Sequence, residues 1–207
     1  MTTLFSPAEW LGGWTSFERY IDADDPAMVQ TWADAEQAAA HMPAMARTAE
    51  HGIRSFWSAL CRTATAEQPN RIDGWRIEPA AQNADDGMTL TWIAQDGLAL
   101  DVCEYHYEGF IDHGLEGRTT LIFRDARADA SGPFTWLIAL QPMPARTEPA
   151  EGRLLSHLHF QYASRRDLLI DPNTGKLANP RWYATMCEDS ADVLAQCNIV
   201  RALHRLS

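Results

Sequence analysis

The chain has 207 residues, of which 46% are hydrophobic, so it is long enough to bury a full core as one domain or as one domain with a helical attachment. Its formal charge of −11 argues against nucleic-acid and anionic-membrane partners, because these need a basic patch and the arginines are scattered. The expected partner is a metal ion or a small organic ligand, and composition says nothing about the oligomeric state.

The N-terminal stretch "MTTLFSPAEWLGGW" has no cationic start, no apolar core of signal-peptide length and no small-residue cleavage site. No apolar run elsewhere has the length of a transmembrane helix. The cysteines lie far apart and form no C-x-x-C pair, a pattern typical of free thiols; they are Cys61, Cys103, Cys187 and Cys197. We therefore expect a cytoplasmic protein with reduced cysteines.

Two helices are indicated in the first third of the chain. In residues 24–40, Asp24 or Asp25 is a suitable N-cap and Pro26 suits the first helical position. The apolar face predicted for this helix consists of Met28, Val29, Trp32 and Ala33. In residues 51–63, a clearer 3.6-residue pattern is formed by Ile53, Phe56, Trp57, Leu60 and Cys61. Helices are thus expected to occupy the region up to about residue 65.

Strand patterns follow from residue 74 onward. "GWRIEP" is short and extended, and residues 88–109 form two strands that meet at Gln95-Asp96-Gly97, a sequence suited to a tight hairpin. Residues 118–126, 134–142 and 154–163 complete the set. Consecutive strands with short turns predict an antiparallel meander, either closed as a barrel or folded as a sandwich.

The chain is expected to end in a helix over residues 190–203. Its inner face would carry Val193, Leu194, Cys197 and Val200, and His204 just beyond it is expected to be solvent-exposed. We find no repeat. The organisation predicted is a single domain with a helical part at about 1–65, a β-barrel at about 72–165 and a C-terminal loop and helix at about 166–207.

"SHLHF" at residues 156–160 contains the most suggestive chemical pattern. In an extended strand His157 and His159 point to the same face, so both imidazoles can reach one metal ion. A third ligand is still required. The opposite face of this strand is the more apolar one, so the histidines either face solvent or line the cavity or mouth of the barrel.

Several motifs in a common order resemble the ZinT (YodA) family of bacterial zinc-binding proteins. They are "LGGWTSFERYIDADDPAMVQ", "CEYHYEG", "TLIFRD", "SHLHF" and "PRWYATM", and they span most of the chain. The resemblance implies an α+β fold, namely a calycin-like or lipocalin-like antiparallel β-barrel with an N-terminal helical segment and a C-terminal helix. It also implies that Trp14 closes one end of the barrel.

In that family the His-x-His pair binds zinc with a third histidine at the end of the preceding strand. The matching position here is Gln141, whose neutral amide is a poor zinc ligand. A substitute is expected from His106 or from another acidic or histidine side chain, the candidates being Glu104, Glu108, Asp112, His113, Glu116, His41 and His51. A second departure from the family is the missing export signal, because the zinc scavengers of that family work outside the cytoplasm.

Two functions remain open. The first is a ZinT-like module that binds zinc or another divalent ion through His157, His159 and a third ligand. The second is a metal-independent enzyme or carrier in which the histidines act on a small organic molecule in the barrel cavity. No nucleophile elbow, P-loop, dinucleotide fingerprint or H-E-x-x-H helix is present. Trp75, Trp92, Trp136 and Trp182 could line such a cavity, although core packing is the commoner role for tryptophan.

Overall fold

The computed structural model describes residues 4–41, 51–81, 85–127, 130–147, 154–181 and 183–206. These residues form eight strands that close into one antiparallel barrel in chain order, with β1 pairing both β2 and β8. The strands are β1 (Gly12–Ser16), β2 (Ile72–Pro79), β3 (Gly87–Ala94), β4 (Ala99–Ile111), β5 (Thr120–Asp125), β6 (Trp136–Leu140), β7 (His157–Ala163) and β8 (Ala184–Glu188). The predicted lipocalin-like barrel with helices is therefore confirmed.

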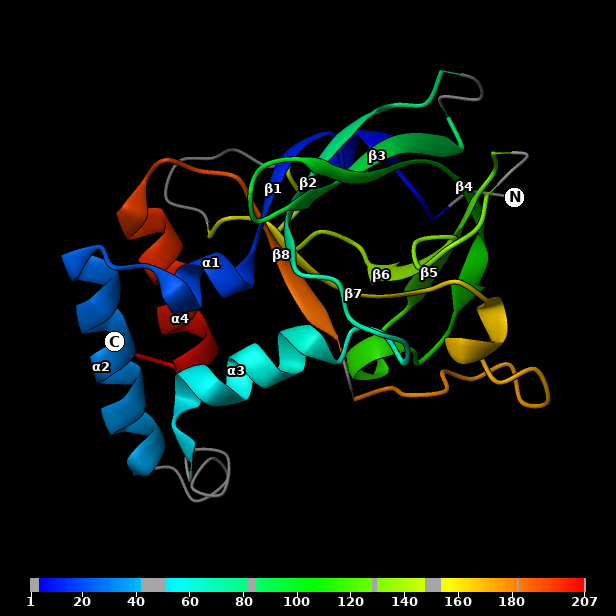
Figure 1. Cartoon of the computed structure of the whole chain (residues 1–207). Helices are drawn as coiled ribbons and strands as arrows, with labels where there is room; N and C mark the ends of the chain where they lie inside the picture. The colour runs from blue at the N-terminus through cyan, green and yellow to red at the C-terminus, as the bar shows by residue number, and fades with distance from the viewer. Residues whose placement is uncertain are drawn as a thin grey trace.

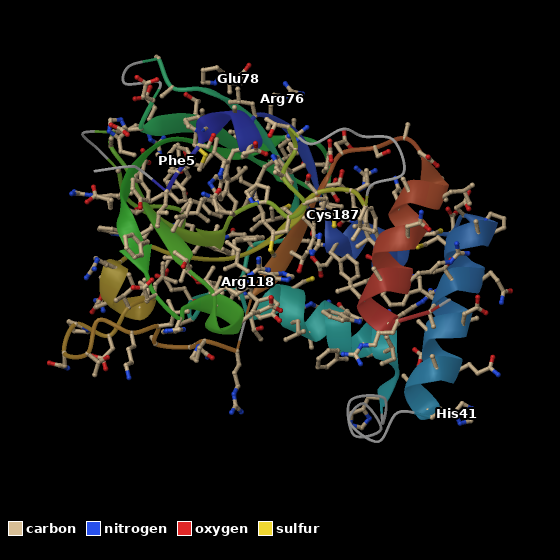
Figure 2. The ribbon with its side chains drawn as sticks, turned by 180° about the vertical axis from the view of Figure 1, so that it is seen from behind. Phe5, His41, Arg76, Glu78, Arg118 and Cys187 are labelled. Atoms are coloured by element: carbon tan, nitrogen blue, oxygen red, sulfur yellow. The ribbon has the colours of Figure 1, made fainter. Side chains whose placement is uncertain are left out.

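The helices gather on one side of the barrel, beside β1 and β8 (Figure 1). They are α1 (Phe17–Asp22), α2 (Pro26–Ala40), α3 (Ile53–Arg62) and α4 (Val193–His204). Short 3-10 turns within the described ranges include η1 (Pro7–Glu9), η3 (Leu115–Gly117) and η4 (Arg166–Leu168). In the view from behind, Cys187 of β8 lies between the barrel and the helices, with which its side chain packs (Figure 2).

Strands β1 and β8 lie outside the barrel limits expected at about 72–165. Each has only five residues, and β1 begins with two glycines, so neither shows an alternating pattern long enough to recognise. Both segments are recognised as strands only through their hydrogen-bonded pairing with neighbouring strands. Trp14 lies opposite Glu188, and Ser16 lies opposite Met186. The barrel closes only because these two short segments from opposite ends of the chain pair with each other.

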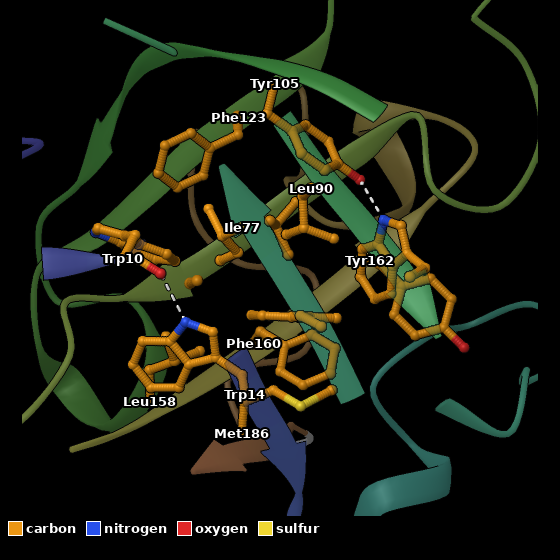
Figure 3. Packing of buried hydrophobic residues seen from close by; sticks show 14 of the residues in the cluster. Trp10, Trp14, Ile77, Leu90, Tyr105, Phe123, Leu158, Phe160, Tyr162 and Met186 are labelled. Carbon is orange, nitrogen blue, oxygen red and sulfur yellow. Dashed lines mark hydrogen bonds between the residues drawn. The ribbon is translucent and has the colours of Figure 1, made fainter. Parts of the chain in front are cut away.

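Aromatic side chains fill the interior of the barrel (Figure 3). Trp75 lies 4.5 Å from Phe160 and Trp92 lies 4.3 Å from Phe134, measured between ring centroids. Trp14 is also inside, and its indole N–H donates to the Trp10 carbonyl over 2.7 Å. Rings at these distances pack as they do in ordinary protein cores, so side chains occupy the space in which a small ligand would have to lie.

The helical layer has a buried core of its own. Asp25 caps α2 by accepting from the Ala27 N–H over 2.8 Å, and Pro26 is the first helical residue, as predicted. Val29 is 44% exposed, whereas Thr31 and Ala35 are buried, so the packed face of α2 is rotated relative to the prediction. The packed face of α2 lies against α4, which runs beside it.

His204 is buried, which contradicts the expectation that it faces solvent. Its side chain is 1% exposed and lies in α4 against Trp32 and Trp57. Trp57 donates its indole N–H to His204 Nε2 over 3.0 Å, and His204 Nδ1 lies 2.8 Å from the Val200 carbonyl. In α4 it is Leu194 that is exposed, at 61%. The helix pattern located α4, and Cys197 and Val200 are buried as predicted, with Val193 partly buried beside them, so the predicted inner face is wrong at Leu194 alone.

No helix in the described ranges has the length and apolar character needed to cross a membrane.

Candidate functional site on the outer face of the barrel

The two histidines of β7 point away from the barrel interior. Leu158, Phe160 and Tyr162 belong to the interior cluster, so alternation along the strand places His157 and His159 on the outer face. They do not line the barrel cavity as the functional interpretation expected. They are not fully in solvent either, because His159 is only 5% exposed.

This outer face is covered by two connections of the barrel. Part of the cover is the β4–β5 connection, which contains η3, and part is the chain between β7 and β8. Both contribute to an apolar cluster against β5, β6 and β7, in which Leu115, Leu169 and Ile170 are buried. The histidines lie beside this cluster, so water has restricted access to their rings.

The η3 turn brings Glu116 to His159. Leu115 is buried beside it, and the Leu115 N–H donates to Thr120 Oγ1 over 2.7 Å. Glu116 itself has φ 52° and ψ 22°, in the left-handed region that residues other than glycine seldom adopt. Such backbone strain is found most often where a side chain must be held in a particular place.

His159 has different neighbours at its two ring nitrogens. Nδ1 lies 2.8 Å from Thr185 Oγ1, and Nε2 lies 3.6 Å from Glu116 Oε1. The second distance is too long for a good hydrogen bond. Tyr183 completes the group, since its hydroxyl donates to Glu116 Oε1 over 2.8 Å and its ring centroid lies 4.4 Å from that of His159.

His157 lies next to His159, with 5.9 Å between the ring centroids. Its Nδ1 atom is buried and has no hydrogen-bond partner within the described part of the chain. A buried ring nitrogen without a partner costs on the order of 1–3 kcal/mol, so it marks a position where a ligand would be favourable.

Burial keeps both histidines in the neutral form. It lowers the pKa of His159 to about 4, against an ordinary value of 6.5, although the Glu116 carboxylate acts in the opposite direction. It also lowers the pKa of His157. The positive charge of Arg118 lowers both pKa values further. At neutral pH both imidazoles therefore carry a free lone pair, the form that binds metal ions.

The structure does not bring the other predicted ligands to this site. Gln141 continues the inward-facing row of Leu137 and Ala139, where it accepts from the Trp10 indole N–H over 3.3 Å and donates to the Leu4 carbonyl. His106 lies on β4 opposite Arg124 of β5, and β5 and β6 separate it from β7. His106 therefore lies three strands away from the histidine pair around the barrel wall.

Of the seven substitute ligands considered, Glu116 is the one that lies beside the pair. The side chains of Glu104, Glu108, Asp112, His113, His41 and His51 are exposed. The sequence indicated neither the contact of Tyr183 with Glu116 nor that of Thr185 with His159, and the second contact arises from the unrecognised β7–β8 pairing. Trp182, considered as a cavity residue, lies outside the described residues. No group of three histidine, cysteine or acidic side chains in the described ranges is already gathered closely enough to hold a metal ion.

All four cysteines are free thiols in the structure, and Cys103, Cys187 and Cys197 are buried. Burial raises the pKa of both Cys61 and Cys103 to about 12, so neither has the character of a reactive thiolate.

Comparison with known proteins identifies no relative of this chain: no protein-family description, no curated protein and no solved structure matches it.

Proposed function

We propose that the protein binds a divalent metal ion, zinc foremost, through His157, His159 and Glu116 on the outer face of the barrel. The observation that carries the proposal is the approach of His159 Nε2 to Glu116 Oε1 at 3.6 Å. With a pKa of about 4, His159 is neutral at pH 7, and in the tautomer whose Nδ1–H donates to Thr185 Oγ1 the Nε2 lone pair is free. A lone pair and a carboxylate then face each other, an arrangement that a cation between them would stabilise.

Two distances at the site are close to those around a zinc ion, although the three side chains are not yet gathered closely enough to hold one. Ligands about 2.0–2.1 Å from a tetrahedral zinc ion lie about 3.4 Å apart, close to the 3.6 Å between His159 and Glu116. Two imidazoles on one zinc have ring centroids about 5 Å apart, and those of His157 and His159 are 5.9 Å apart. Small side-chain rotations would close both differences. The partnerless Nδ1 atom makes His157 the natural third ligand.

The surrounding groups match what metal sites require around their ligands. Thr185 would orient His159, and Tyr183 would orient Glu116 by donating to the same carboxylate. Arg118 is the group that opposes a cation, but its side chain is exposed and its charge is screened by solvent. The resemblance to the ZinT family supports zinc as the ion, because the family's His-x-His pair binds zinc, but Gln141, which matches the family's third ligand, lies against Trp10 instead.

The alternative function, a metal-independent enzyme or carrier with its ligand in the barrel cavity, lacks comparable support. The histidines face outward, and the interior is packed with aromatic side chains. We also propose that the protein works in the cytoplasm with reduced thiols, an assignment supported by four unpaired cysteines.

Calorimetric titration of untagged, chelator-treated protein with zinc tests the metal proposal. We expect His157→Ala, His159→Ala and Glu116→Gln each to weaken zinc binding at least tenfold, which corresponds to about 1.4 kcal/mol. His41→Ala is the matched control, because His41 is exposed at the end of α2, far from the barrel (Figure 2). Equal zinc affinities in all four variants and the parent protein would refute the site.

A further inference from the structure

A second candidate site lies in the helical layer, away from the histidines. A groove of about 810 Å³ runs along α3, with the end of α1 as its opposite wall. Its lining residues are Ile21, Asp22, Arg54, Ser58 and Arg62, together with Ser55 and Ala59. The groove is wide and open to solvent, so a ligand in it would lie along the surface of α3.

The polar residues of the groove are arranged in a row. Arg54, Ser58 and Arg62 are spaced four residues apart on α3, so they lie along one side of the helix. With a rise of 1.5 Å per residue, the two arginines are anchored about 12 Å apart along the helix axis. The Ser58 hydroxyl lies between them, and that of Ser55 lines the same groove.

Both arginines are available to a ligand. In the described part of the chain neither forms an ion pair with a carboxylate, although the charge of Arg62 acts to lower the pKa of the nearby Glu18, which burial raises. The one acidic residue in the groove, Asp22, is already bound by Arg71 over 2.8 Å. Arg54 is held in place by the Trp32 ring, whose centroid lies 5.7 Å from the guanidinium carbon.

From this arrangement we propose that the α3 groove, defined by Arg54, Ser58 and Arg62, binds a small organic anion with oxyanion groups at both ends. Guanidinium groups match the geometry of carboxylates and phosphates, and serine hydroxyls donate to the same oxygens. The flexible arginine stems let the two groups converge on a ligand shorter than 12 Å. The site is independent of the metal proposal, since it shares no residue with the outer face of β7.

Titration calorimetry at low ionic strength with three probes tests the proposal. Inorganic triphosphate and adipate each carry negative charge at both ends and distinguish a phosphate ligand from a carboxylate ligand, whereas inorganic phosphate offers one group. We expect one of the two-ended probes to bind at least tenfold more tightly than inorganic phosphate. Arg54→Gln and Arg62→Gln should each weaken that binding at least tenfold, and added salt should weaken it in the parent protein.

Arg166→Gln is the control, because it removes the same charge from an exposed position outside the groove. It should change affinity by less than about twofold. Arg62 is exposed, so Arg62→Gln keeps the test valid even if Arg54→Gln disturbs the packing on Trp32. The proposal is overturned if neither two-ended probe binds, if inorganic phosphate binds equally well, or if Arg166→Gln loses as much affinity as the groove variants.

Discussion

The burial of His159 predicts a specific loss of stability in acid. The pKa of this side chain is about 4 in the folded protein and 6.5 when the chain is unfolded and the ring is in water. Above pH 6.5 the ring is neutral in both the folded and the unfolded state, so its protonation does not change the free energy of unfolding. As pH falls below 6.5 the unfolded state takes up a proton that the folded state excludes, so folding is destabilised until the pH reaches the folded pKa.

The size of the effect follows from these two pKa values. Between pH 7 and pH 5 the unfolded ring becomes almost fully protonated while the folded ring stays mostly neutral, which destabilises the folded protein by about 2 kcal/mol. Urea denaturation of the metal-free protein at the two pH values measures this loss. In His159→Gln the same change of pH should cost about 2 kcal/mol less than in the parent protein, because the glutamine cannot titrate.

The comparison between the two proteins isolates His159 from the other titrating groups, which both share. The variant is expected to be less stable than the parent at pH 7, so the informative quantity is the difference between the two pH values within each protein. If the parent and His159→Gln lose the same free energy of unfolding from pH 7 to pH 5, His159 is not held neutral by burial. The argument that its lone pair is free at neutral pH would then fail.

Four further outcomes are expected. His204→Ala should lower the free energy of unfolding by about 2–4 kcal/mol, because it opens a cavity and leaves the Trp57 N–H unpaired, whereas His41→Ala should change it by less than about 0.5 kcal/mol; equal denaturation midpoints would contradict the burial of His204. Gln141→His should leave zinc affinity unchanged, since this side chain faces Trp10 rather than the histidines; tighter binding in calorimetry would place Gln141 in the site. Tyr183→Phe should weaken zinc binding about tenfold through loss of the hydrogen bond to Glu116, and an unchanged affinity would remove Tyr183 from the site. Thiol titration of protein denatured after non-oxidising preparation should detect four free cysteines, and a smaller number would reveal an oxidised pair.

The elements recognised from the sequence were those with long, regular local patterns. The hairpin of β3 and β4 was located through Asp96-Gly97, where Gly97 has φ 80° and supplies the turn. Helix α3 was located through an apolar stripe that recurs with the helical period, and α2 through its Asp25 cap. Each of these features depends on residues within about ten positions of one another, so the local sequence is sufficient to predict it.

Local sequence patterns predicted only part of the candidate site. The shared face of His157 and His159 follows from alternation along one strand, and it needs no other part of the chain. Glu116 was one of seven possible third ligands, and nothing in its own neighbourhood distinguished it from Asp112 or His113. Its selection depends on the β4–β5 connection folding over β7, a contact between residues more than 40 positions apart.

The sequence by itself determined that the chain forms an antiparallel meander flanked by helices, because periodicity and turn residues act locally. Only the tertiary structure decided that β1 and β8 close the barrel, and which face of β7 points inward. The bulky residues Leu158, Phe160 and Tyr162 bury more apolar surface in the closed interior than the histidines would, so closure places His157 and His159 outside. The burial that keeps His159 neutral comes from the same closure, together with the connections that fold over its outer face.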